Sequence, residues 1–189
     1  MDSYLDIQLR PDPDFAPHML MSALFNKLHR TLFELHAQDI GISFPEHRHG
    51  VQARTLGNRL RLHSTAARLA QLMETPWLTG MRDHVQLSAP LTVPAETRHI
   101  QVMRKQPNLG GPSRVKRYAK RHGISESEAE ALYAQLATRR LTLPFVTLNS
   151  RSTGQRFNLL IAHGKPQKTA QSGPFNHYGL SQHATVPWF

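Results

Sequence analysis

The sequence predicts an α+β fold, and three observations support this prediction. Short runs that alternate apolar and polar residues indicate strands, and apolar residues three or four positions apart indicate helices. Both patterns occur and alternate through the first half of the chain. The composition then changes between Pro90 and Pro94, since ten of the 13 acidic residues lie within residues 1–96. We therefore expect one domain over 1–94 and a second, basic and irregular α+β domain over 95–189.

In the first domain the patterns follow the order strand, helix, strand, strand, helix, strand. The first helix is the clearest, because residues 18–36 place seven apolar side chains at helical spacing. A polar loop is expected over 46–57, and Ser64 is expected to cap the second helix. The expected strands cover 4–10, 40–44, 59–63 and 84–87. This order is that of the ferredoxin-like split βαβ unit, which hosts many functions and assigns none.

The second domain is less regular. Residues 97–103 have an extended pattern, and the glycines and prolines of 105–112 indicate a loop or hinge. A short helix should follow over 113–122. Ser125 begins a capping box, Ser-Glu-Ser-Glu, which predicts another helix to about Arg140. The remaining expected strands cover 145–148, 156–163 and 186–189.

The composition excludes several classes of protein. The 189 residues contain no cysteine, which excludes a disulfide scaffold, a thiolate metal site and a cysteine nucleophile. No apolar run approaches the ~20 residues that cross a bilayer, and the first residues lack the pattern of a signal peptide. We therefore expect a cytoplasmic protein with no membrane partner.

Positive charge is concentrated in the second domain. The net charge is +10, and residues 97–189 hold 14 of the 23 basic side chains but three of the 13 acidic ones. Placed on a helical wheel, residues 114–122 have a cationic face and a narrow apolar stripe, with no acidic residue to relieve the repulsion. Phosphates of a nucleic acid explain this face better than a membrane surface, which would need larger apolar residues. The cationic face consists of Arg114, Lys116, Arg117, Lys120 and Arg121.

His29 is the best placed of the 12 histidines for chemistry. It lies at the edge of the apolar stripe of the first expected helix, one turn after Phe25, so the core could orient it while it reaches a ligand. An imidazole with an ordinary pKa of ~6.5 suits proton transfer near neutral pH. The same pattern also fits a half-buried structural histidine. His47 and His49 could share a metal ion, but no carboxylate cluster accompanies them.

Several segments resemble one known family in the same order. They are residues 143–157 (LPFVTLNSRSTGQRF), 178–181 (YGLS) and 186–189 (VPWF), with similar stretches at 1–13 and 24–29. These segments are similar to the CRISPR RNA-processing endoribonuclease of type I-F systems. The resemblance covers nearly the whole chain, apart from residues 46–57 and 107–113.

The resemblance implies a specific activity. The protein would bind a hairpin in the repeat RNA of a CRISPR transcript, cut once at the 3′ base of the stem, retain the product, and contact other subunits of the type I-F surveillance complex. A ribose 2′-hydroxyl would attack without a metal or other cofactor, leaving a 2′,3′-cyclic phosphate and a 5′-hydroxyl. The catalytic residues that the resemblance implies are His29, Ser150 and Tyr178.

The resemblance also implies how the RNA is held. Arg104 and Gln106 would read base pairs at the foot of the stem, since both side chains can make paired hydrogen bonds to a base edge. Phe157 would stack near the hairpin, and Ser152 would help to place the ribose or the neighbouring backbone. The basic helix would follow the phosphates of the stem. Two of its positions, Lys116 and Lys120, depart from the arginines of the family pattern, and lysine cannot make a bidentate phosphate contact.

The residue types agree with this chemistry. RNA carries its own nucleophile, so the protein must supply a proton acceptor, alignment and charge stabilisation. We expect His29 to be the base and Ser150 to align the hydroxyl. Tyr178 would orient His29, because the ordinary pKa of a phenol, ~10, is too high for it to ionise. The cation that stabilises the charge on the phosphate and the acid that protonates the leaving group stay unassigned. The alternative function is that of a non-catalytic subunit that binds the hairpin. A metal-dependent nuclease is disfavoured because no carboxylate lies beyond Glu130.

Overall fold

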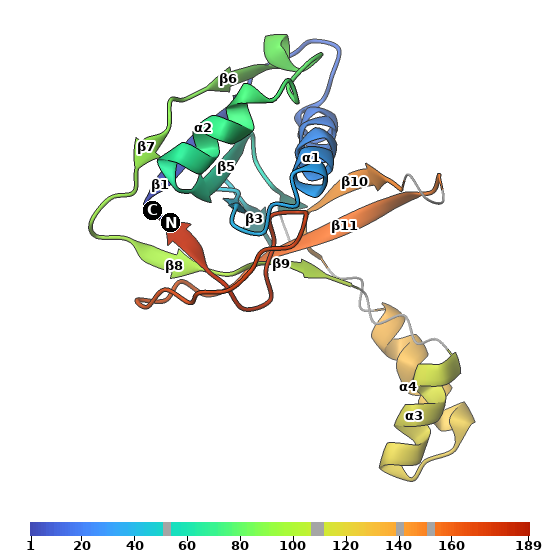
Figure 1. The fold of residues 1–189 in the computed structure, drawn as a ribbon. Coiled ribbons are helices and arrows are strands. Elements are labelled where there is room, and N and C mark those ends of the chain that lie inside the picture. Colours follow the sequence, from blue (N-terminus) through green and yellow to red (C-terminus); the bar gives the residue numbers. More distant parts are fainter. Residues whose placement is uncertain (51–53, 107–111, 139–141, 151–153) are drawn as a thin grey trace. The chain divides into compact units, whose positions relative to one another are not determined.

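The computed structural model describes residues 1–50, 54–106, 112–138, 142–150 and 154–189 (Figure 1). The chain forms two compact units. The first contains Met1–Lys105 and Leu143–Phe189, and the second contains Gln106–Thr142. Segments from both sides of residue 94 therefore belong to the first unit, while the division into domains of 1–94 and 95–189 stays a prediction. In the described part of the chain, no helix has the length and apolar character needed to cross a membrane.

The largest sheet of the first unit is antiparallel and has the strand order β2-β5-β1-β6, with β7 also paired to β1. Helix α1 (Pro17–Glu34) follows β1, and helix α2 (Ala66–Glu74) follows β5. A 3₁₀ turn at Arg82–His84 leads into β6. The strands are β1 (Ser3–Leu9), β2 (Gly41–Ser43), β5 (Arg59–Ser64), β6 (Val85–Leu87) and β7 (Leu91–Thr92). The mixed α+β class is confirmed, and the finer ferredoxin-like arrangement stays a prediction.

The main core of this unit joins the sheet to both helices. In β1 every second residue is buried, and Leu5 and Ile7 pair across the sheet with Leu62 and Leu60 of β5. From α1, the apolar positions that gave the helical pattern are buried against them: Leu20, Met21, Leu24, Phe25, Leu28 and Leu32. Burial of this stripe is what holds α1 in place, because a helix gains most of its stability from packing.

The opposite face of the sheet carries a buried ion pair. Arg61 donates from Nε to Oδ1 of Asp6 at 2.7 Å and from its second terminal nitrogen to Oδ2 at 2.9 Å. Its guanidinium lies 4.5 Å from the ring centre of Tyr4 and 4.2 Å from that of Phe189. The charge is therefore both paired and stacked, as a buried arginine requires.

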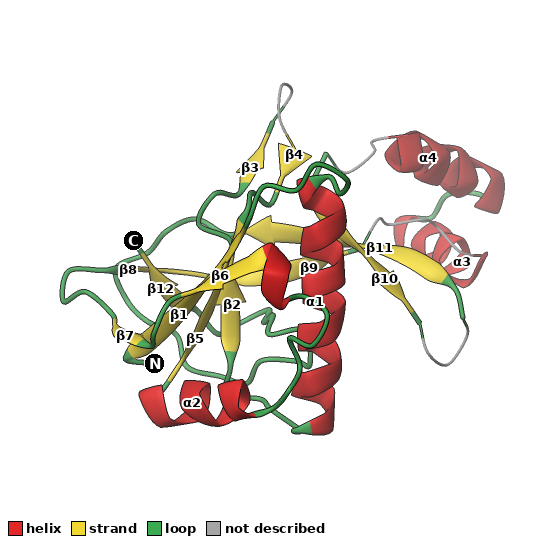
Figure 2. Cartoon of the chain, turned by 90° about the horizontal axis from the view of Figure 1, so that it is seen from above, coloured by secondary structure: helices red, strands yellow, loops and turns green. Residues whose placement is uncertain are grey.

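A second sheet has the order β10-β11-β9, and α1 lies against its outer strand β10 (Figure 2). Two smaller ladders pair β8 with β12 and β3 with β4. The strands are β3 (Arg48–His49), β4 (Arg54–Thr55), β8 (Arg98–Ile100), β9 (Val102–Lys105), β10 (Phe145–Asn149), β11 (Arg156–His163) and β12 (Val186–Trp188). Helix α1 thus contacts both sheets, which brings segments far apart in the sequence to one side of the helix.

Two expectations for the first unit were wrong. The polar loop predicted over 46–57 contains the short β3–β4 ladder, because two-residue strands are too short to show an alternating pattern. Thr65, not Ser64, caps α2: its hydroxyl accepts from the Arg68 amide at 3.3 Å. Ser64 is the last residue of β5, and its hydroxyl donates to the Asp39 carbonyl at 2.8 Å instead.

The second unit consists of helices α3 (Pro112–His122) and α4 (Glu126–Thr138). The predicted capping box is confirmed at the start of α4. The Ser125 amide donates to Glu128 Oε2 at 2.9 Å, and the Glu128 amide donates to Ser125 Oγ at 3.2 Å. A small apolar cluster joins the two helices: Val115, Ala119 and Ala129 are buried, with Tyr118 and Ile124 packed against them.

Candidate functional site

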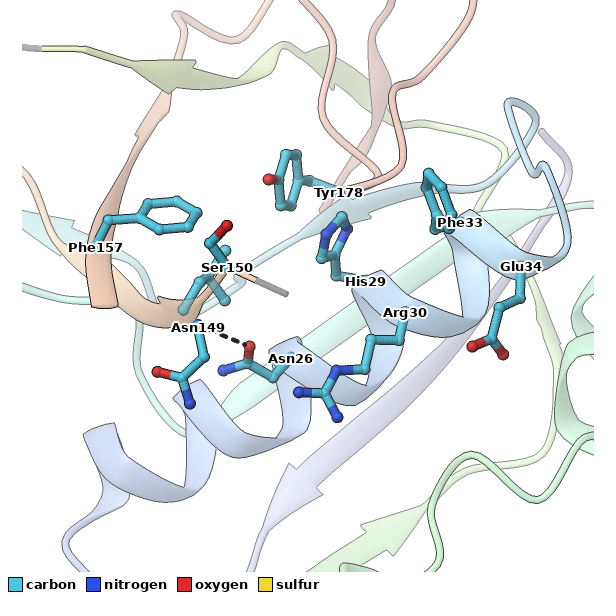
Figure 3. Close-up of a pocket in the computed structure, with 10 residues that line it drawn as sticks. Asn26, His29, Arg30, Phe33, Glu34, Asn149, Ser150, Phe157 and Tyr178 are labelled. Carbon is cyan, nitrogen blue, oxygen red and sulfur yellow. Dashed lines mark hydrogen bonds between the residues drawn. The ribbon is translucent and has the colours of Figure 1, made fainter. Parts of the chain in front are cut away.

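A cavity of about 380 Å³ opens beside the C-terminal half of α1, within the first unit (Figure 3). Its walls come from α1, from the end of β10, from β11 and from the loop that precedes β12. Four side chains singled out in the sequence line it, although they come from four separate segments: His29, Ser150, Phe157 and Tyr178. The complete lining is Asn26, His29, Arg30, Phe33, Glu34, Leu148, Asn149, Ser150, Phe157 and Tyr178.

The imidazole of His29 is held in one orientation. Its Nδ1 lies 2.8 Å from the carbonyl oxygen of His177. A carbonyl only accepts, so Nδ1 carries the hydrogen and the neutral ring has its lone pair on Nε2. Burial lowers the pKa of His29, an effect that the His177 hydrogen bond opposes and the nearby charge of Arg30 reinforces. The ring is therefore mostly neutral at neutral pH, the form that can accept a proton.

Tyr178 stacks on His29. The two rings are nearly parallel, with centroids 4.0 Å apart and planes at 18°. The other neighbour of Tyr178 is Phe25, whose ring lies 6.3 Å away at 14°. Tyr178 therefore anchors the imidazole to the core through its ring.

The loop that carries Tyr178 is fixed by its own backbone. The side chain of Asn176 accepts from the amides of Tyr178 at 2.9 Å and Leu180 at 3.2 Å. Gly179 has φ +70°, and an added Cβ would lie 2.7 Å from Ile42. The Gly179 carbonyl accepts from the Ile42 amide at 3.0 Å, which ties this loop to β2. Glycine is needed here for both its conformation and the close approach.

Ser150 directly follows the last residue of β10. Its amide donates to the Gln155 carbonyl at 2.9 Å, and its carbonyl accepts from the Gly154 amide at 2.8 Å. Phe157 in β11 pairs with Leu148 of β10, so its ring reaches the same cavity. These contacts hold Ser150 at the end of a paired strand. Ser152, a candidate for placing the ribose, lies outside the described residues.

The two candidates for base reading lie in or next to β9. Arg104 is half-buried, and its guanidinium lies 5.9 Å from the ring centre of Phe157. Its carbonyl oxygen accepts from the side chain of Gln182 at 3.0 Å. Gln106 is exposed and follows the end of β9, at the start of the second unit. Arg104 and Phe157 are thus brought together near the cavity.

Helix α3 exposes the predicted cationic face. Its apolar stripe, Val115 and Ala119, is buried against Ala129 of α4, whereas His122, which the helical wheel placed in this stripe, is exposed. Because α4 covers the stripe, α3 has no free apolar face of the kind that a membrane-surface helix needs. The exposed cations are Arg114, Lys116, Arg117, Lys120 and Arg121.

The histidines considered as metal ligands form a ring stack. The ring of His47 stacks on that of His163, with centroids 4.1 Å apart and planes at 13°, while the ring of His49 lies 5.5 Å from His47 and is tilted by 50°. Burial is the main cause that lowers the pKa of His163, to about 3. Across the described ranges, no three His, Asp or Glu side chains gather in a way that could hold a metal ion.

The sequence analysis missed several residues of the cavity. Asn26, Arg30 and Phe33 share one face of α1 with His29, and the i, i+3, i+4 and i+7 spacing could have identified them. The carbonyl of His177 orients His29, but a backbone contact of this kind leaves no signal in a single sequence.

The comparisons with known proteins agree with these observations. A family model described as "CRISPR-associated protein (Cas_Csy4)" matches residues 4–189. A "CRISPR-associated endonuclease Cas6/Csy4" from Pseudomonas aeruginosa (strain UCBPP-PA14) is 48% identical over 189 residues, and all of both chains is covered. A protein of the same description from Escherichia coli (strain UTI89 / UPEC) is 40% identical over 190 residues, again with all of both chains covered. The chain therefore belongs to the Cas6/Csy4 family of CRISPR-associated proteins, which confirms the family that its motifs resemble.

Proposed function

We propose that the protein is an endoribonuclease that matures CRISPR RNA. It binds the stem-loop of the repeat, cuts at the 3′ base of the stem, and retains the product as part of a larger complex. Two relatives that match the full chain are described as CRISPR-associated endonucleases. The first unit would carry out the cut, and its strand order, with a helix after β1 and after β5, supports a ferredoxin-like arrangement.

The orientation of His29 is the observation that carries this proposal. With Nδ1 bound to the His177 carbonyl and a lowered pKa, the imidazole is a neutral base. The ring stack on Tyr178 restrains it, and Ser150 lines the same cavity. A base with a pKa below, but close to, the working pH is suited to general base catalysis.

The reaction follows from these groups. Ser150 hydrogen-bonds the ribose 2′-hydroxyl, and His29 takes its proton through Nε2. The bond from O2′ to phosphorus forms as the bond from phosphorus to O5′ breaks, and O5′ then takes up a proton. The products are a 2′,3′-cyclic phosphate and a 5′-hydroxyl, and no metal takes part. Arg30 lines the cavity and is our candidate for stabilising the extra negative charge on the phosphate.

Binding of the hairpin would use a wider surface. The cations of α3 would contact the phosphates of the stem, and Arg104 and Gln106 would read its lowest base pairs. Phe157 would stack near the hairpin, and Ser152 would help to place the ribose. DNA of the same sequence would not be cut, because the attacking hydroxyl is missing.

The test uses a type I-F repeat hairpin RNA incubated with the protein in EDTA, with mass spectrometry of the new RNA end. We expect a 2′,3′-cyclic phosphate and no cleavage of a control RNA with one 2′-deoxy substitution upstream of the cut. The rate should fall on acidification only at a pH lower than the ordinary imidazole pKa of ~6.5, because burial lowers the pKa of His29 and keeps the base neutral further into the acid range. A 3′-hydroxyl end would overturn the mechanism, and a mobility shift without cleavage would indicate a non-catalytic RNA-binding subunit.

A further inference from the structure

The outer edge of β10 is paired with helix side chains rather than with another strand. Among the residues that the structure describes, β10 is the last strand of its sheet, so the backbone groups that face away from β11 have no strand partner there. The Thr147 amide donates to Ser22 Oγ at 3.1 Å, and the Asn149 amide donates to Asn26 Oδ1 at 3.5 Å. The Thr147 carbonyl accepts from Asn26 Nδ2 at 3.0 Å. We name these four residues of α1 and β10 the helix–strand seam.

Asn26 is the centre of the seam. Its Nδ2 donates to two carbonyls, those of Ser22 at 2.9 Å and Thr147 at 3.0 Å, while its Oδ1 accepts from Asn149 (Figure 3). The side-chain amide therefore bridges Thr147 and Asn149 as the peptide group of a neighbouring strand would. The reverse orientation would place Oδ1 against two carbonyl oxygens, so the network fixes the amide in one orientation.

The periods of the helix and the strand match along the seam. Four residues of an α-helix rise ~6 Å, and two residues of an antiparallel strand rise ~6.8 Å. Ser22 and Asn26 can therefore meet Thr147 and Asn149 in register. The next helical turn carries His29, and the next residue of the chain after Asn149 is Ser150. The seam thus ends at the candidate catalytic site.

We infer that Asn26 is a positioning residue that sets where Ser150 lies along α1 relative to His29. This inference rests on the proposed function, because it concerns the alignment of the attacking hydroxyl. The seam is a direct hydrogen-bonded link between the helix that carries the base and the strand that ends at the serine. A misplacement of ~1 Å between reacting groups can lower a rate ~100-fold, so a loosened seam should act on the rate of the cut.

The test compares single-turnover cleavage of the repeat hairpin with hairpin affinity. Asn26→Ala should cleave about 10- to 100-fold more slowly, while the dissociation constant changes less than about threefold. Asn26→Asp keeps the size of the side chain but cannot donate to the two carbonyls. We expect the same loss of rate in this variant, which replaces Asn26→Ala in the test if the alanine variant fails to fold. Ser22→Ala is the matched control, because it removes a seam bond one turn further from the cavity and should slow cleavage less than threefold.

Combination with Ser150→Ala separates positioning from a merely structural role. If Asn26 acts by placing Ser150, Asn26→Ala should add no further loss in the Ser150→Ala background. Multiplied losses, an unchanged rate for Asn26→Ala, or equal losses of rate and affinity would each overturn the inference.

Hydrogen exchange tests the seam without reference to cleavage. The amide of Asn149 should exchange faster in Asn26→Ala than in the wild type, and the amide of Thr147 should exchange faster in Ser22→Ala. If the two variants change amide exchange in this way but the wild type does not cut RNA, the proposed function fails and the seam stands. If the wild type cuts RNA but Asn149 exchange is unchanged in Asn26→Ala, the inference fails and the proposed function stands.

Discussion

The two compact units differ in how they are stabilised. The first joins strands and helices through one large core, and hydrogen bonds to backbone groups hold parts of its candidate site. The second, among its described side chains, buries three small apolar ones and exposes five cations on one helix. This difference indicates that the two units meet different structural requirements. Proton transfer needs atoms held to within an ångström, whereas attraction between cations and phosphates tolerates a lightly packed support.

The largest expected effect lies in the first unit. His29→Ala should lower the cleavage rate about 10²- to 10⁴-fold, because it removes the proposed proton acceptor. Affinity for the hairpin should stay within a few fold, since the cations proposed to bind its stem belong to α3. Single-turnover cleavage and filter binding on the same preparations measure both quantities.

The matched control is His18→Ala, which removes an exposed histidine from the first turn of the same helix. It should leave both quantities unchanged. Loss of affinity together with cleavage in His29→Ala would refute a purely chemical role for His29.

Acid should destabilise the first unit in particular. His63 is fully buried with Nε2 2.8 Å from Ser43 Oγ, and burial holds its pKa well below the ordinary value, as it does for His163, whose pKa is about 3. In the unfolded chain both protonate near pH 6.5, so the free energy of unfolding is unaffected above that pH and falls as the pH drops below it. Each histidine contributes a slope of about 1.4 kcal/mol per pH unit until its folded-state pKa is reached.

Urea unfolding of the full chain between pH 7 and pH 4 measures this slope. His163→Gln should flatten it by about 1.4 kcal/mol per pH unit, because the proton that His163 takes up on unfolding is lost. The exposed His122 of the second unit provides the control, since His122→Gln should leave the slope unchanged. An identical slope in wild type and His163→Gln would contradict the contribution assigned to His163.

The smallest effect is expected for the second unit, where each cation contributes a modest share. Arg117→Ala combined with Lys120→Ala should weaken hairpin binding and lower the slope of log affinity against log salt by about 2. The cleavage rate of bound RNA should not change. The matched control removes two exposed arginines of the first unit, Arg10→Ala with Arg82→Ala, and should leave the slope intact. Equal effects of the two pairs would show that α3 has no special role.

Most of the fold could be predicted from periodicity. The stripe of α1, the alternation in β1 and the capping box at Ser125 are local patterns that tertiary packing reinforces. The β3–β4 ladder could not be predicted, since its strands contain two residues each. The cap at Thr65 was missed because Ser64 has an equally suitable hydroxyl, and pairing in β5 decides which of them is free.

The candidate site was predictable only in part. Motif resemblance pointed to His29, Ser150 and Tyr178, and all three line one cavity. The stacking of Tyr178 on His29 and the contact of His29 with the His177 carbonyl depend on how distant loops pack, which periodicity does not encode. Helical spacing could have placed Asn26 beside His29, but the positioning role inferred for it depends on its contacts with β10, which are distant in the sequence.

The helix–strand seam has a consequence for self-association. An unpaired edge strand is a template on which another chain can add a strand and start an aggregate. The side chains of Ser22 and Asn26 in α1 already bind the backbone groups of β10 to which such an added strand would pair. The contacts that would align the reactive groups therefore also protect this edge of the sheet from strand addition. The same few side chains would thus serve both catalysis and solubility.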